Sequence, residues 1–311
     1  MRSLLPRRGR RTGRPLVLFL LLVTLGLVLP TATASTSAAA AALIDPGQVT
    51  ANYQNFKGPP IPGWSGPVSG TTACPAGQRM TGIGAGGYVR SLTPTATFSG
   101  ARMTGQVASP LDLVQVVTLC APSGQFGDVK TLDVRDHRTE DKSSQYIQTT
   151  GRCPDGYFAF GGGAAFEDSS GTVRPADWVV GNGPSVDGSS WQFTAMVPEF
   201  GLTLRLRTQC APRTGKELLV QEFTDEVTGA WKNVSSYAHC PAGYTPIAGG
   251  FSVADKYGQQ SLPTPGFLIA GNLRWSTGGP LTVDNGLRSW YSSVQIAPEH
   301  RLMVRAQCLS A

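Results

Sequence analysis

The three histidines are the side chains best suited to acid–base chemistry at neutral pH, and none stands in a catalytic pattern. His137 lies in a highly charged stretch that is typical of a solvated loop. His239 directly precedes Cys240, and His300 lies in a short polar segment that predicts a turn. No serine occupies a Gly-x-Ser-x-Gly motif, so a serine hydrolase is not indicated.

Phosphate, metal and cofactor chemistry are no better supported. The glycines at 161–163 are not followed by the Lys-Ser/Thr pair of a phosphate-binding loop. Glu167 and Asp168 precede two serines and a glycine, an arrangement that could ligate calcium but is more typical of a polar hairpin turn. No Cys-x-x-Cys occurs, which disfavours zinc. We expect no metal and no cofactor, although two of the 20 carboxylates could form the acid pair of a glycoside hydrolase.

The tryptophans are the most informative side chains for binding. Trp191 and Trp290 extend alternating apolar stripes, 19 and 18 residues before a cysteine, and are predicted to be buried. Trp64 and Trp231 have Gly, Ser, Lys and Asn as neighbours, so we expect them to be partly exposed. An exposed indole ring can stack on a sugar or anchor a protein partner, which makes these two the candidate ligand-binding residues. The alternative is that both rings cap the end of a sheet.

Three repeated segments must position these side chains. Each opens with Cys-Pro-x-Gly, continues through a glycine cluster and closes on a cysteine at the end of an alternating apolar run. Six cysteines allow fifteen pairings, and the repeat selects one bridge within each segment. The predicted disulfides are Cys74–Cys120, Cys153–Cys210 and Cys240–Cys308.

The backbone signals within each repeat indicate β-strands. Proline after the opening cysteine cannot donate to a sheet, and the glycine two residues later permits a positive φ, so a strand should run into a turn there. The following glycine clusters indicate bulges or close backbone approach. Segment 217–227 has helical spacing of apolar residues, but its counterparts favour a strand, which we expect here too. The predicted fold class is all-β, with antiparallel repeats at 48–125, 126–213 and 214–311.

The N-terminal region predicts export. Six arginines lie within the first fourteen residues, and an apolar run and the small residues Ala32-Thr33-Ala34 follow them. We expect a secretory signal peptide at 1–34, a flexible stub at 35–47 and no membrane span in the mature, extracellular chain. An uncleaved signal anchor is the alternative. An oxidising destination favours the three disulfides.

The basic character of the whole chain comes from this leader. The sequence has 26 basic and 20 acidic residues, and removing the six leader arginines leaves 26 − 6 = 20 basic residues, a net charge of zero. The pI of about 9.1 therefore gives no support to nucleic acid as a partner.

The Cys-Pro-x-Gly, Gly-Gly and Cys-Ala pattern resembles a module of secreted bacterial proteins, most of them functionally uncharacterised, and covers nearly all of 48–311. More remotely, three cysteine-framed all-β repeats are similar to the β-prism of vitelline membrane outer layer proteins. In that family three four-stranded sheets surround a pseudo-threefold axis. The resemblance implies a structural or carbohydrate-binding role rather than a catalytic one. The repeats here are longer than that family's, so three tandem β-sandwich modules are the alternative.

These features predict a secreted, non-enzymatic, disulfide-stapled β-repeat protein that binds glycans or cell-surface material. A secreted polysaccharide or cell-wall hydrolase that uses carboxylates is the second candidate. A structural coat or matrix component is the third.

Overall fold

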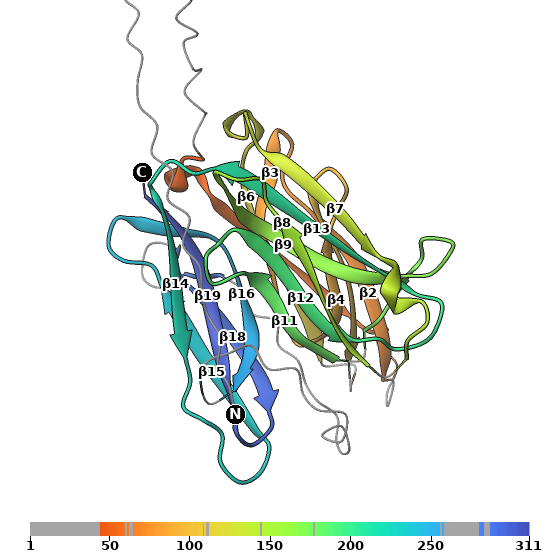
Figure 1. Ribbon diagram of the computed structural model, residues 1–311. Coiled ribbons are helices and arrows are strands. Elements are labelled where there is room, and N and C mark those ends of the chain that lie inside the picture. The colour runs from red at the N-terminus through yellow and green to blue at the C-terminus, as the bar shows by residue number, and fades with distance from the viewer. Residues whose placement is uncertain are drawn as a thin grey trace, which may run out of the picture. The chain divides into compact units, whose positions relative to one another are not determined.

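The computed structural model describes residues 44–59, 61, 65–107, 109, 112–143, 145–176, 178–255, 257, 280–282 and 287–310. This part of the chain is almost entirely antiparallel β-structure, with three 3-10 turns, η1 (Pro46–Gln48), η2 (Ser123–Gln125) and η3 (His137–Thr139) (Figure 1). The predicted all-β class is therefore confirmed. In the described ranges no helix is long and apolar enough to cross a membrane. The predicted signal peptide lies outside these ranges.

The strands fall into three sets, one for each repeat. The first set contains β1 (Thr50–Lys57), β2 (Gly66–Ala73), β3 (Gln78–Gly86), β4 (Tyr88–Pro94), β5 (Gly100–Val107) and β6 (Leu113–Pro122). The second contains β7 (Lys130–Asp136), β8 (Tyr146–Arg152), β9 (Tyr157–Glu167), β10 (Val173–Arg174), β11 (Trp178–Pro184), β12 (Ser190–Met196) and β13 (Thr203–Pro212). The third contains β14 (Glu217–Phe223), β15 (Lys232–His239), β16 (Tyr244–Asp255), β17 (Pro280–Thr282), β18 (Leu287–Ile296) and β19 (His300–Ser310). The segment with helical spacing at 217–227 begins as the strand β14, as expected.

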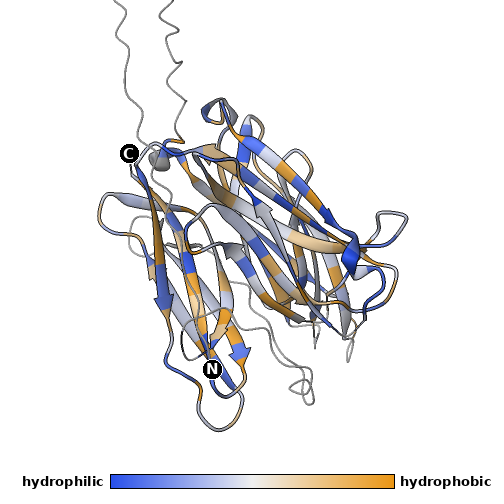
Figure 2. Cartoon of the chain, in the orientation of Figure 1, coloured by the Kyte–Doolittle hydropathy of each residue, from blue (hydrophilic) through white to orange (hydrophobic). Residues whose placement is uncertain are grey.

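Each set has the same strand order. One layer is β1-β6-β3 in the first set, β7-β13-β9 in the second and β14-β19-β16 in the third. The other layer is β2-β5-β4, β8-β12-β11 and β15-β18-β17. The internal repeat of the sequence is thus a repeat of topology. Hydrophilic and hydrophobic residues alternate along the strands, as layers with one buried face require (Figure 2).

Neighbouring sets share sheets. Strand β4 of the first set pairs with β9 of the second, and β11 of the second pairs with β16 of the third. Independent sandwiches in tandem would not pair in this way, and the described strands all belong to one compact unit. In addition, β3, β9 and β16 contact one another. A pseudo-threefold axis requires such mutual contact. The β-prism arrangement stays a prediction.

The three disulfides join the two layers within each set. Cys74–Cys120, Cys153–Cys210 and Cys240–Cys308 are bonded, with Cα–Cα distances of 5.7, 5.6 and 5.7 Å. Each opening cysteine directly follows the second strand of its set, and each closing cysteine lies in the last strand. The pairing selected by the repeat is therefore confirmed.

The glycine clusters make room for the buried tryptophans. Trp191 and Trp290 are each 1% exposed, as the alternation predicts. A Cβ at Gly162 would lie 2.7 Å from the ring of Trp191, and one at Gly249 would lie 2.3 Å from the ring of Trp290. No side chain fits at that distance. Glycine is thus required at 162 and 249 because the indole ring of the same set lies directly against the backbone.

A repeated arginine contact connects neighbouring sets. Arg207 in β13 donates from Nη1 to the carbonyl oxygen of Pro94, at the end of β4, over 2.9 Å. Arg305 in β19 donates from Nη1 to the carbonyl oxygen of Pro184, at the end of β11, over 2.7 Å. Both arginines precede the closing cysteine of their set by three residues. The corresponding residue of the first set is the buried Val117, which cannot donate.

A glutamine next to the closing cysteine makes a second contact of this kind. Gln209 Nε2 donates to the carbonyl oxygen of Met80 over 2.6 Å, and Gln307 Nε2 donates to that of Ala159 over 2.7 Å. In the first set the equivalent residue is Leu119, which is fully buried. Each later set is therefore held to the one before it by hydrogen bonds from buried arginine and glutamine side chains.

Candidate functional site

The histidines are engaged in local contacts in separate elements. His137, in η3, pairs through Nδ1 with Glu140 Oε1 at 2.8 Å, and both side chains are largely exposed. His300 Nδ1 lies 2.8 Å from the carbonyl oxygen of Pro298. Among the described residues no three His, Cys, Asp or Glu side chains form a group that could hold a metal ion. The structure does not bring these histidines into one site.

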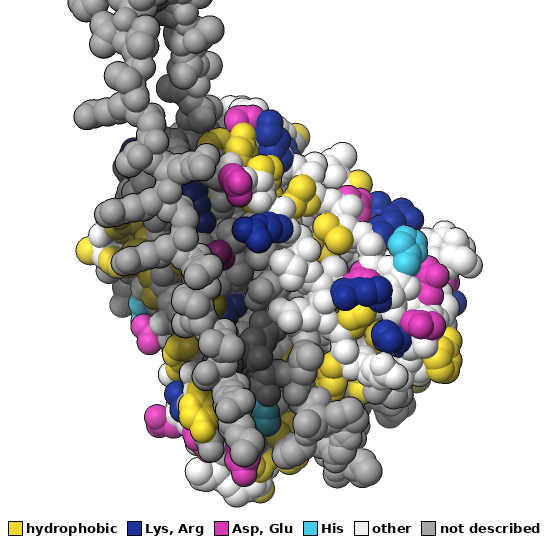
Figure 3. Space-filling model, viewed as in Figure 1, with side chains coloured by type: hydrophobic (Ala, Val, Ile, Leu, Met, Phe, Trp, Pro, Cys, Tyr) yellow, Lys and Arg dark blue, Asp and Glu magenta, His cyan; other side chains and the backbone are white. Residues whose placement is uncertain are grey.

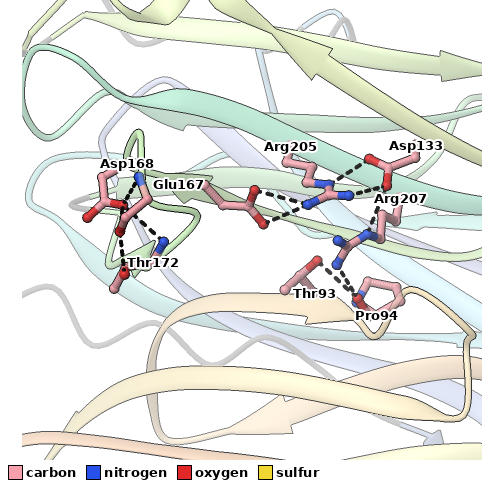
Figure 4. Close-up of polar contacts among 9 residues, drawn as sticks. Thr93, Pro94, Asp133, Glu167, Asp168, Thr172, Arg205 and Arg207 are labelled. Atoms are coloured by element: carbon pink, nitrogen blue, oxygen red, sulfur yellow. Dashed lines mark hydrogen bonds and ion pairs between the residues drawn. The ribbon is translucent and has the colours of Figure 1, made fainter.

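The suggested calcium loop is a polar hairpin turn between β9 and β10. Asp168 Oδ1 accepts hydrogen bonds from the Ser170 amide at 2.9 Å, the Ser170 hydroxyl at 2.6 Å and the Thr172 amide at 3.0 Å (Figure 4). Its Oδ2 pairs with Arg174 at 3.0 Å. The hydrogen bond from Ser170 is the main cause of the lowered pKa of Asp168. The carboxylate thus stabilises the turn, which was the favoured interpretation.

A ladder of ion pairs crosses strands β7, β13 and β9 of the same sheet. Arg205 lies between Asp133, at 2.6 Å, and Glu167, at 3.2 Å, and Arg207 Nε lies 3.3 Å from the same Asp133 (Figure 4). The hydrogen bond from Arg205 is the main cause of the lowered pKa of Asp133. Basic and acidic side chains are interspersed on the face shown in Figure 3. In this ladder the charges are matched, which favours a structural role.

An aromatic platform lies on the sheet formed by β15 and β18. Tyr237 and Tyr291 are directly opposite in the register, with ring centroids 4.8 Å apart. The imidazole of His239 stacks on Tyr237 at 5.8 Å, with 10° between the planes. Tyr237 is 42% exposed, and His239 is also exposed. We call these three residues the aromatic platform.

Hydrogen-bonding side chains continue the same face. Ser235 and Asn233 lie two and four residues before Tyr237 on β15, and their register partners on β18 are Ser293 and Gln295. Residues two apart on a strand share a face, so amides and hydroxyls flank the aromatic rings. All four are exposed or half-buried.

Of the two predicted ligand-binding tryptophans, Trp231 does not belong to this platform. Trp64 lies outside the described residues. Trp231 directly precedes β15, is half-buried and packs against the buried hydrophobic residues of the core. Because a strand rises by about 3.3 Å per residue, Trp231 lies about 20 Å from Tyr237 along the chain. The platform was missed because Tyr237 and Tyr291 are 54 residues apart in sequence and meet only through the register.

A polar groove of about 740 Å³ lies on the sheet shared by the second and third sets. We call it the Arg305 groove. The residues that characterise its lining are Thr150 and Arg152 of β8, Asp187 of the β11–β12 turn, Ser190 and Gln192 of β12, and Arg305 of β19. It is open to solvent and carries more polar groups than the apolar pockets that bind most small ligands.

Comparison with known proteins adds no function. No family model matches the chain, and no curated protein matches it. The geometry of these surfaces therefore carries the functional argument.

Proposed function

We propose that this protein is a secreted, non-enzymatic, disulfide-stapled β-repeat protein that binds glycans through the aromatic platform. The single observation that supports this is the surface cluster of Tyr237, Tyr291 and His239 beside amide and hydroxyl groups, in which Tyr237 and His239 are exposed and Tyr291 is half-buried. Aromatic faces pack against the apolar C–H face of a sugar ring, and amides and hydroxyls bond its hydroxyl groups. An open platform on the face of a sheet suits an extended polysaccharide better than an enclosed small molecule.

The carboxyl groups whose pKa is shifted favour a binding function over hydrolysis. A glycosidase needs a general acid whose pKa is raised so that it stays protonated near neutral pH. In the described residues each carboxyl with a clear shift has its pKa lowered, chiefly by hydrogen-bond donors. For Asp136 the main donor is Arg138, and for Asp187 it is Ser185. These groups are carboxylates at neutral pH, which suits structural pairing.

The two tyrosines of the platform allow a direct test with a matched control. The mature protein and a Tyr237→Ala/Tyr291→Ala variant are passed over a panel of immobilised glycans and cell-wall polysaccharides. Losing both rings should weaken retention at least about fivefold, because each aromatic contact contributes roughly 0.5–1.5 kcal/mol. Tyr53, on β1 of the first set, is 46% exposed and serves as the control through Tyr53→Ala.

The outcomes separate clearly. Retention lost by the platform variant and kept by Tyr53→Ala supports the proposal, provided that both variants melt close to the parent. Equal retention of all three proteins, or no retention of the parent by any glycan, overturns it.

A further inference from the structure

Arg305 is a buried cation held entirely by neutral acceptors. It is 3% exposed, and besides its Nη1 bond to Pro184 its Nε donates to Gln221 Oε1 over 3.0 Å and its Nη2 to the sulfur of Met303 over 3.1 Å. A guanidinium carries five N–H donors, so these contacts leave two for another acceptor. Within the described part of the chain, no carboxylate pairs with it.

The equivalent arginine of the second set has a counterion. Arg207 lies opposite Asp133 in the register of β13 and β7, and Arg305 lies opposite Gln221 in the register of β19 and β14. The backbone contact to a proline carbonyl is the same in both. The substitution of glutamine for aspartate therefore leaves the charge of Arg305 unmatched at a site where the fold has room for a carboxylate. Such a buried charge is costly unless an anion pairs with it.

Arg305 reaches the groove that bears its name, and the other lining groups suit a polar anion. Arg152 adds an exposed positive charge, while Ser190 and Gln192 supply a hydroxyl and an amide. Asp187 is the acidic residue of the lining. It already accepts hydrogen bonds from the Ser185 hydroxyl at 2.6 Å and from the amide and hydroxyl of Ser189 at 3.0 and 2.8 Å.

We propose that the Arg305 groove binds the carboxylate or sulfate group of an acidic sugar, with Arg305 and Arg152 as the anion-binding residues. The neighbouring hydroxyl and amide groups would bond the hydroxyls of the same sugar. Burial lowers the pKa of Arg305 to about 10, so the guanidinium stays charged at neutral pH. This site is separate from the aromatic platform and does not depend on it.

The sequence itself supplies the decisive variant. Gln221→Asp installs the carboxylate that the second set already has, and it should pair with Arg305 without disturbing the fold. Calorimetric titration of the mature protein uses oligogalacturonate as the carboxylate probe, a sulfated oligosaccharide as the sulfate probe and a neutral chito-oligosaccharide. At least one acidic probe should bind, and Gln221→Asp should weaken that binding by at least about tenfold, the usual effect of losing a hydrogen bond to a charged group.

Two further variants control for net charge and folding. Gln54→Asp adds the same charge at an exposed position of β1 and should leave acidic-probe binding unchanged. Arg152→Ala alters an exposed side chain and should weaken binding several-fold even if Gln221→Asp misfolds. The stronger of the two acidic probes identifies the anion. The proposal is overturned if neither acidic probe binds, if Gln54→Asp weakens binding as much as Gln221→Asp, or if folded Gln221→Asp and Arg152→Ala both bind like the parent.

Discussion

Truncating Trp191 should be among the most damaging single changes in this protein. Its side chain is 1% exposed, its ring lies against Gly162, and its Nε1 donates to Asn182 Oδ1 over 2.8 Å. Burial of a tryptophan removes roughly 200 Å² from water, which at about 25 cal/mol per Å² is worth about 5 kcal/mol before the compactness of the unfolded chain is considered. Large aromatic truncations in cores cost about 3–5 kcal/mol. We expect Trp191→Ala to lower the free energy of unfolding by about 4 kcal/mol.

The assay is reversible denaturant unfolding of the oxidised mature protein, with thermal melting as a second measure. At roughly 2–4 °C per kcal/mol, Trp191→Ala should melt about 10 °C below the parent. Trp191→Phe keeps most of the packing but leaves Asn182 Oδ1 without its indole donor. Its melting temperature should therefore lie between those of Trp191→Ala and the parent. Trp231→Ala should cost clearly less because that side chain is half-buried, and Phe200→Ala, at a site 68% exposed, should cost almost nothing. Equal losses for Trp191→Ala and Trp231→Ala would refute the reasoning that the fully buried ring contributes more stability than the half-buried one.

Three further predictions concern the covalent and ionic structure. Peptide mapping without a reducing agent should recover Cys153 linked to Cys210, and a bridge between different repeats would contradict the repeat logic. Asp136→Asn should destabilise the protein by about 2 kcal/mol at pH 7, because hydrogen bonds from Arg138 above all lower the pKa of Asp136 from 3.8 to about 2. That contribution is complete above the unfolded pKa near 4 and is lost as pH falls through 2, so denaturation curves of the parent and the variant should converge there. N-terminal sequencing of the exported protein should start near Ser35, whereas an intact Met1 in a membrane fraction would contradict cleavage.

Local sequence patterns determined the fold class and the covalent framework. Alternating apolar residues specify half-buried strands because side chains alternate between the two faces of a strand. The three Cys-Pro-x-Gly openings and their closing cysteines repeat in order, so the pairing followed from sequence alone and Cys74–Cys120 and its two counterparts are bonded as expected. The burial of Trp191 and Trp290 followed from the same alternation.

The tertiary structure alone decided how the repeats meet and which side chains share a surface. The glycine clusters predicted bulges or close backbone approach, but only the structure shows that Gly162 and Gly249 lie against tryptophan rings. Likewise, no local pattern distinguishes Arg305 from any other strand arginine until the register places it opposite Gln221. The physical reason is that strand pairing is non-local: a shift of one residue reverses every face, and the choice of partner depends on packing across the whole sheet. Alternation in the sequence therefore predicts which residues of one strand lie on the same face. Only the assembled sheets show which residues of other strands contact that face.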